Sequence, residues 1–175
     1  MKKLLNVGLL AAALMLGNAC NSQNQEDKSK RASPPAQVSQ KINSGATITI
    51  NYGRPSVKGR TIGKDLEPMD GKVWRTGANE ATVFETDKEL MVQDGKLPAG
   101  KYSLYTIFNG NDVTVIFNKT WNQWGTNYSE ADDALRIKTT ASEASPASEK
   151  LNFKISPSGL VTLIWGPKKV DFTVK

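Results

Sequence analysis

Two stretches of the sequence carry residue types that could hold a ligand. The first, called the 71–82 segment, sets four candidate site residues between glycines and a β-forming run: Trp74, Arg75, Asn79 and Glu80. The second, called the 121–128 loop, adds three aromatic candidates beside side-chain amides: Trp121, Trp124 and Tyr128. Flat rings supply apolar contact area and amides supply orientation, which suits sugar faces or peptide segments. The two stretches therefore predict a ligand-binding surface, with carbohydrate or an envelope polymer as the preferred ligand class.

Each stretch also has a purely structural interpretation. Trp74 would cover an edge of the core, and a turn between Arg75 and Glu80 would bring the two charges together as an ion pair. The two tryptophans of the 121–128 loop would fold inward and cap one end of the domain. Loops on rigid β scaffolds often carry function, so the sequence leaves both interpretations open.

Most catalytic chemistries are excluded by composition, because the chain has no histidine and a single cysteine. It therefore has no Ser-His-Asp or Cys-His catalytic site and no zinc site of the usual kind. The sequence also has no glycine-rich loop of the kind that binds nucleotide phosphates. We expect neither a cofactor nor a metal. Carboxylate chemistry remains, since glycoside hydrolysis needs only two acids flanking a sugar bond. Glu80 with Asp65, Glu67 or Asp70 would supply them, which makes a carboxylate-based hydrolase the alternative function.

The N-terminal residues predict export. Residues 1–19 have the form of a signal peptide, with Lys2 and Lys3 ahead of an apolar run too short for a comfortable membrane span. Cys20 follows where a lipoprotein signal peptidase would cut, although Gly17 stands where leucine is preferred. We expect lipidation of Cys20 and anchoring to a bacterial membrane in the cell envelope, facing the periplasm or the cell surface. The alternative is a soluble secreted protein.

Charge and composition limit the other partners. Cleavage before Cys20 removes two lysines and lowers the formal net charge from +6 to +4. Basic residues are interleaved with acids, so nucleic-acid binding is not expected, and another envelope protein is the macromolecular partner that remains. Residues 20–35 are polar without apolar periodicity, which predicts a flexible tether. The rest of the chain, 36–175, is the right length for one domain.

Short apolar runs separated by turn residues fill this domain. Residues 46–52 are apolar at every second position, which indicates a half-buried strand, and residues 43–45 predict the turn of a hairpin before it. About ten such runs occur, with hardly any helical pattern. They predict an all-β domain, an antiparallel two-sheet β-sandwich with the jelly roll as one form of it. The polar segment 142–149 and a turn at 166–168 are expected to separate the last strands.

Five pieces of sequence, two of them within the stretches above, are distinctive in combination. They are RPSVKGR at 54–60, GKVWRTGANEAT at 71–82, LPAGKYSL at 97–104, VIFNK at 115–119 and NQWG at 122–125. With their spacing they resemble the bacterial family called domain of unknown function 2911, over residues 33–175. That family has no established activity, so the resemblance implies an all-β domain. Its members usually carry a glutamate beside the C-terminal tryptophan, where this chain reads LIWGP at 163–167.

Overall fold

The computed structural model describes residues 27–175, so the predicted signal peptide and Cys20 lie outside the described residues. The described chain consists of antiparallel strands, connecting loops and two short 3-10 turns, and the all-β antiparallel prediction is confirmed. Within residues 27–175, no helix is long and apolar enough to cross a membrane. The elements are η1 (Lys28–Lys30), β1 (Pro35–Lys41), β2 (Thr47–Gly53), β3 (Val73–Trp74), β4 (Thr82–Thr86), β5 (Leu90–Val92), β6 (Gly95–Leu97), β7 (Gly100–Asn109), β8 (Asp112–Asn118), η2 (Glu130–Asp132), β9 (Asp133–Ile155) and β10 (Leu160–Thr173).

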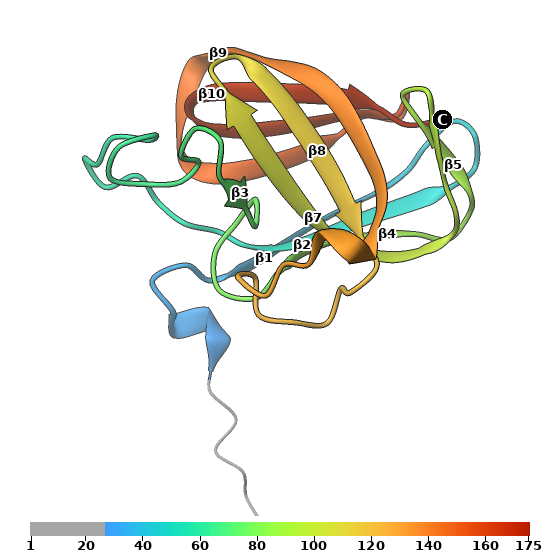
Figure 1. Cartoon of the computed structure of the whole chain (residues 1–175), viewed down its shortest axis with the longest axis horizontal. Helices are drawn as coiled ribbons and strands as arrows, with labels where there is room; N and C mark the ends of the chain where they lie inside the picture. The colour runs from blue at the N-terminus through green and yellow to red at the C-terminus, as the bar shows by residue number, and fades with distance from the viewer. Residues whose placement is uncertain (1–26) are drawn as a thin grey trace, which may run out of the picture.

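Eight of these strands form one curled antiparallel sheet (Figure 1). Its order is β1-β2-β4-β7-β8-β9-β10, and β3 pairs with β7 beside that path. Strands β5 and β6 form a separate two-stranded sheet, joined by a bridge from Val92 to Val174 just after β10. Residues 55–57 continue from β2 and bond to residues 149–151 of β9, so the curl brings the first part of the chain back to the last.

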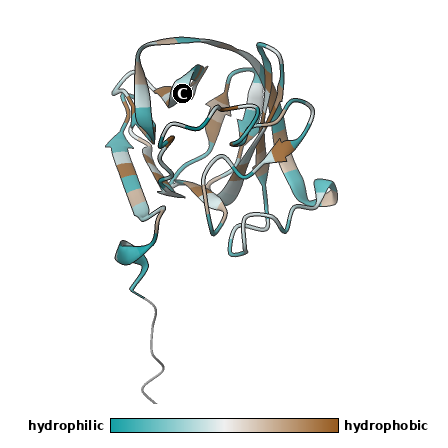
Figure 2. Ribbon diagram, turned by 90° about the vertical axis from the view of Figure 1, so that its left-hand side faces the viewer, coloured by the Kyte–Doolittle hydropathy of each residue, from teal (hydrophilic) through white to brown (hydrophobic). Residues whose placement is uncertain are grey.

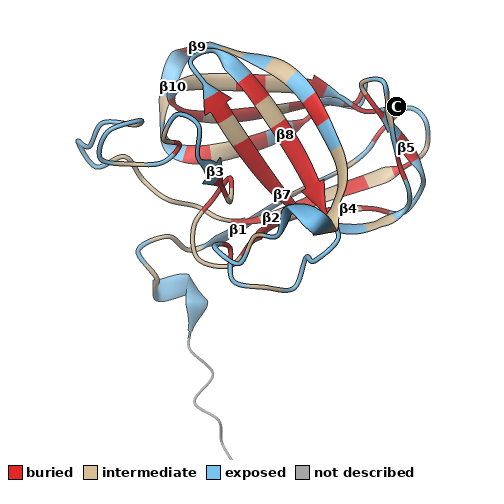
Figure 3. Ribbon diagram, viewed as in Figure 1, coloured by how far each residue is buried: buried red, intermediate tan, exposed pale blue. Residues whose placement is uncertain are grey.

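The core lies inside the curl. Strand β2 buries Ile48 and Ile50 and turns its threonines outward, as its alternation predicts. Phe117 meets Phe84 and Phe172 edge to face, at ring-centroid distances of 5.1 and 6.0 Å. Figure 2 shows apolar and polar positions alternating along the strands, and Figure 3 shows buried residues on the same strands. Removing these side chains from water provides the main stabilisation of the fold.

The last part of the chain differs from expectation. Residues 142–149, expected as a polar connection, belong to β9, and residues 166–168, expected as a turn, belong to β10. The two strands form one long hairpin with register shifts around Gly166. Ala144 is buried while most of its neighbours are exposed, so this part of the hairpin needs little apolar sequence. Hydrogen bonds between the strands keep these polar residues extended.

Residues 27–35, expected within the flexible tether, contact the domain. Asp27 caps η1, because its carboxylate accepts hydrogen bonds from the Ser29 amide at 3.2 Å and from the Ser29 hydroxyl at 2.6 Å. Strand β1 then begins at Pro35 and pairs with β2 in the predicted hairpin. This stretch therefore does not extend freely from the domain, because it is hydrogen-bonded to the 71–82 segment.

Candidate functional site

The 71–82 segment is a structured loop that carries β3 and leads into β4. Thr76 and Asn79 have positive φ values of 49° and 66°. Asparagine visits this left-handed region more readily than most residues, as its place in the sequence predicts. The Thr76 hydroxyl lies 3.1 Å from that of Thr106 on β7 and donates to the Trp74 carbonyl at 3.2 Å. These bonds tie the turn to the sheet and fix where its side chains lie.

Trp74 and Arg75 differ in their surroundings. Trp74 is 4% exposed and packs against Phe108 with ring centroids 6.4 Å apart, as its structural interpretation predicts. Arg75 is half-buried, and its Nη1 donates to the Asn79 carbonyl at 3.2 Å. The ion pair between Arg75 and Glu80, expected from their spacing, is not formed. Residues 27–35 supply the partners of Glu80 instead.

Two cations of the N-terminal stretch bind Glu80. Arg31 Nη1 lies 3.0 and 2.8 Å from the two carboxylate oxygens, and Lys28 Nζ lies 2.8 Å from Oε1. Burial alone would raise the pKa of Glu80, but hydrogen bonds from Lys28, its own amide and Arg31 outweigh it and lower the pKa to about 2. The Asn79 side-chain amide donates to the Ser33 carbonyl at 2.9 Å. A cavity of about 360 Å³ remains between this stretch and strands β1, β2 and β4.

Glu80→Gln is expected to lower the free energy of unfolding at neutral pH by about 1 kcal/mol, because charge-assisted hydrogen bonds are lost while exposure weakens each of them. The Glu80 side chain is 42% exposed, so the cost stays below that of a buried pair. Since the folded pKa is lowered, this contribution is complete above the ordinary pKa of 4.5 and is lost as the pH falls toward about 2. Urea unfolding across that pH range measures it. Tryptic cleavage after Lys28 and Arg31 should become faster in the variant.

Glu85→Gln is the matched control. Glu85 has a similarly exposed side chain, at 41%, and one partner in Lys101 Nζ at 3.3 Å. We expect a smaller loss of stability and unchanged cleavage after Arg31. Equal effects of the two substitutions at every pH would contradict the role of Glu80 in holding the N-terminal stretch.

The 121–128 loop lies against the 71–82 segment. The Gly125 amide donates to the Asn79 carbonyl at 3.1 Å, and Figure 1 shows the loop below the lower end of β7. A side chain at Gly125 would not fit, because its Cβ would lie 2.3 Å from Cδ of Arg75. The fold thus brings together the two stretches that the sequence singles out.

Side chains of both stretches line one cavity of about 330 Å³, called the central cavity. It is lined by Glu67, Val73, Trp74, Arg75, Tyr105, Gly125, Thr126 and Tyr128. Three of these, Trp74, Arg75 and Tyr128, are predicted site residues. Trp74, Arg75 and Glu67 also line a smaller cavity of about 200 Å³, so Arg75 is accessible from two hollows.

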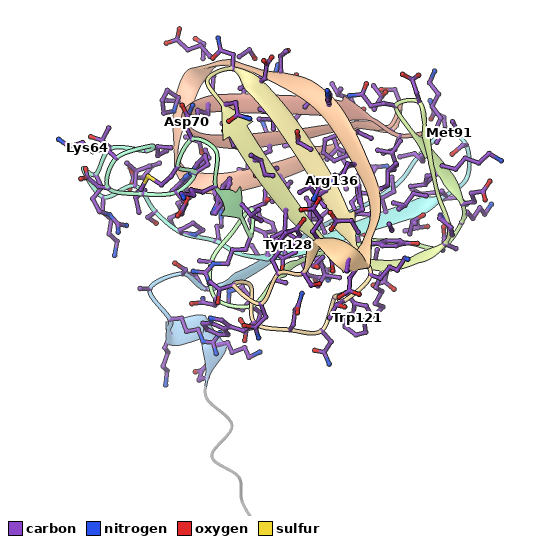
Figure 4. The ribbon with its side chains drawn as sticks, viewed as in Figure 1. Lys64, Asp70, Met91, Trp121, Tyr128 and Arg136 are labelled. Carbon is purple, nitrogen blue, oxygen red and sulfur yellow. The ribbon has the colours of Figure 1, made fainter. Side chains whose placement is uncertain are left out.

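A hydrogen-bonded cluster fixes the aromatic wall of the central cavity. The rings of Tyr105 and Tyr128 meet edge to face, 4.9 Å apart. The Tyr128 hydroxyl donates to Asp133 Oδ2 and accepts from Arg136 Nη2, both at 2.8 Å, and Figure 4 shows Tyr128 and Arg136 side by side. Burial and then the bond to Asp133 raise the pKa of Tyr128 to about 12, and burial raises the pKa of Tyr105. Both phenols are therefore neutral at physiological pH.

The two tryptophans of the loop are exposed rather than folded inward. Trp121 is 39% and Trp124 is 47% exposed, which contradicts the inward cap expected as their structural role. Lys101 Nζ lies 5.1 Å from the centroid of the Trp121 ring, and the backbone of Trp124 bridges to Glu80. Both side chains are therefore partly open to solvent.

The acids considered for catalysis are engaged separately. The carboxylates of Asp65, Glu67 and Asp70 each accept a hydrogen bond from a different backbone amide, at 2.9, 2.7 and 3.3 Å. Glu67 lines the central cavity, whereas Glu80 lines the cavity beside the N-terminal stretch. Among residues 27–175, no three ligating side chains are grouped to hold a metal ion.

Tyr105, Gly125 and Thr126 line the central cavity although the sequence did not single them out as site residues. The sequence signal for Tyr105 is the pairs of adjacent apolar residues Leu104-Tyr105 and Ile107-Phe108, where a half-exposed strand would alternate, and positions 102–106 of β7 are all buried in the structure. Burial on both faces indicates that something covers the outer face. No local signal in the sequence marks the two loop residues.

Comparison with curated proteins and with solved structures found no match. The family model described as Protein of unknown function (DUF2911) matches residues 33–174. The matched range includes every residue that lines the central cavity. It also agrees with the resemblance carried by the five sequence pieces. Because the match covers most of its length, the chain belongs to the DUF2911 family.

Proposed function

We propose that this protein is a lipid-anchored binding module of the bacterial cell envelope, which holds a carbohydrate or envelope polymer without changing it chemically. The observation that carries the proposal is the central cavity, to which both predicted stretches contribute. The N-terminal sequence supports lipidation of Cys20 and a position facing the periplasm or cell surface. We also propose that the curled sheet is a two-layer β-sandwich, of which the jelly roll is one form.

The chemistry of the central cavity suits a sugar. Its volume of about 330 Å³ falls within the range of small-molecule sites. Arg75 offers hydrogen-bond donors and Glu67 offers acceptors, which sugar hydroxyls need in combination. The Tyr128 hydroxyl is engaged by Asp133 and Arg136, so Tyr128 presents its ring. Because Trp124 adjoins the lining residues Gly125 and Thr126, a longer polymer would meet its exposed ring.

The geometry favours binding over hydrolysis. A general acid in glycoside hydrolysis needs a raised pKa so that it is protonated at working pH. The pKa of Glu80 is lowered to about 2, and Arg31 and Lys28 occupy its carboxylate oxygens. Glu80 therefore serves to hold the N-terminal stretch rather than to donate a proton.

Arrays of glycans and cell-wall fragments, with turnover monitored in the same samples, test the proposal. We expect binding without turnover. Thr126→Trp should abolish it, because Thr126 is an exposed residue of the cavity lining and the indole would fill the hollow. Asn127→Trp, the matched control, adds the same ring at an exposed neighbour outside the lining and should keep binding.

Other outcomes would contradict the proposal. If both variants retain binding, the central cavity is not part of the ligand site. Turnover of a bound glycan would favour the hydrolase, and binding to envelope proteins alone would favour a protein partner.

A further inference from the structure

Arg75 has no carboxylate partner among the residues that the structure describes. Its Nη1 bonds to the Asn79 carbonyl at 3.2 Å, which leaves most of its five N–H donors unused by protein acceptors. Among the other arginines of the described residues, Arg136 pairs with Asp133 at 2.7 Å and Arg31 with Glu80 at 2.8 Å. Arg54 and Arg60 bond to backbone carbonyls, and neither lines the central cavity. A half-buried charge without a counter-charge is costly, and binding an anion would offset that cost.

Arg75 borders two hollows of the structure. Arg75 lines the central cavity together with Tyr105 and Tyr128, and it also lines the smaller cavity of about 200 Å³. Burial raises the pKa of Tyr105, and the positive charge of Arg75 opposes that rise. The positive charge of Arg75 therefore acts on the phenol of Tyr105, which forms part of the cavity wall.

The side chain of Arg75 is held in place before any ligand arrives. Gly125 approaches so closely that a Cβ there would lie 2.3 Å from Cδ and 3.0 Å from Cβ of Arg75. The loop thus clamps the aliphatic stem, and the bond to Asn79 fixes one end of the guanidinium. A donor that is already ordered loses little conformational entropy when it binds a ligand.

Glu67 lines the same cavity but does not neutralise Arg75. Its Oε2 accepts from the Met69 amide at 2.7 Å, and no ion pair joins it to Arg75 in the described chain. Glu67 is exposed, so water screens its charge, whereas Arg75 is half-buried. The cavity therefore offers an acceptor for hydroxyl groups and a cation for an acidic group.

We infer that the central cavity binds a sugar unit that carries an anionic group, a carboxylate or a phosphate, with Arg75 as the counter-charge. The inference rests on the proposed carbohydrate-binding function and narrows its ligand class. Arginine matches both anions because its planar fork forms two parallel hydrogen bonds with either.

Three probes that share one ring test the inference: D-glucuronate, D-glucose 6-phosphate and uncharged D-glucose. Amide chemical-shift titrations of the isotope-labelled full chain give the three dissociation constants. We expect at least one anionic sugar to bind roughly tenfold to a hundredfold more tightly than glucose, the usual gain from a charge-assisted hydrogen bond. Arg75→Gln should remove that preference, because it weakens binding of the anionic sugar more than binding of glucose. Added salt should weaken the binding of the anionic sugars and leave the binding of glucose unchanged.

Two variants serve as controls. Arg75→Lys keeps the charge and an aliphatic stem, so it should retain part of the preference even if Arg75→Gln is poorly folded in thermal melting. Lys64→Gln removes the same unit charge from an exposed residue far from Tyr128 (Figure 4) and should change nothing.

The outcomes separate this inference from the proposed function. A preference for glucuronate identifies a carboxylate ligand, a preference for glucose 6-phosphate identifies a phosphate ligand, and either supports the inference. Equal binding of all three sugars, unchanged in Arg75→Gln, would overturn the anionic specificity and leave carbohydrate binding intact. No shift of the cavity amides with any of the three would overturn the inference, and the glycan arrays would still decide on carbohydrate binding itself.

Discussion

Trp74→Ala is expected to lower the free energy of unfolding by about 3–5 kcal/mol, the usual cost of emptying a large buried aromatic site. Trp74 is 4% exposed, packs against Phe108 and forms part of the wall of two cavities. The backbone around it cannot collapse into the space, because Thr76 ties the turn to Thr106 on β7. Urea unfolding followed by circular dichroism measures the loss.

Trp121→Ala removes the same side chain from an exposed position. Trp121 is 39% exposed and Lys101 Nζ lies 5.1 Å from its ring centroid, so we expect a loss below about 1 kcal/mol. If the two substitutions cost the same, the assignment of Trp74 to the edge of the core is refuted.

Gly125→Ala is expected to lower the free energy of unfolding and to remove the preference for an anionic sugar. The new Cβ would lie 2.3 Å from Arg75 Cδ and 2.9 Å from the Asn79 carbonyl oxygen. Neither distance is tolerable, so the loop and Arg75 must separate, at an overpacking cost of about 1–3 kcal/mol. With Arg75 displaced, glucuronate should bind no better than glucose. Urea unfolding and the sugar titration give the two values.

Asn127→Ala is the control within the same loop. Asn127 is exposed, and its backbone amide, which bonds to the Trp124 carbonyl at 3.0 Å, is kept in the variant. We expect wild-type stability and wild-type sugar preference. A Gly125→Ala protein with the same behaviour would show that the loop does not hold Arg75.

Local features of the fold could be predicted because neighbouring residues determine them. The alternation over residues 46–52 correctly placed Ile48 and Ile50 inside, and the turn at 43–45 gave the first hairpin. Asn79 adopts the left-handed conformation that asparagine tolerates. The prediction of a polar connection at 142–149 was wrong, because the strand conformation there comes from pairing with β10 and not from an apolar pattern of its own.

The contacts that build the site could not be predicted, because they join residues far apart in the sequence. Arg31 and Glu80 are separated by 49 positions, and nothing near Glu80 indicates that its cation comes from the N-terminal stretch. Sequence spacing therefore indicates Arg75, the nearest arginine, as the partner. The approach of Gly125 to Arg75 likewise depends on how the loop crosses the outer face of β7.

The most direct test of the account is to map the binding site of the glycan found in the arrays by its effect on the amide resonances of the protein. The central claim is that the 71–82 segment and the 121–128 loop form one ligand site. We expect the largest shifts at Arg75, Tyr105, Gly125 and Thr126, from both stretches and from β7 between them. Another hollow of about 430 Å³ lies on the β9–β10 hairpin, lined in part by residues 144–148. Shifts confined to that hairpin, with the central cavity unaffected, would contradict the account.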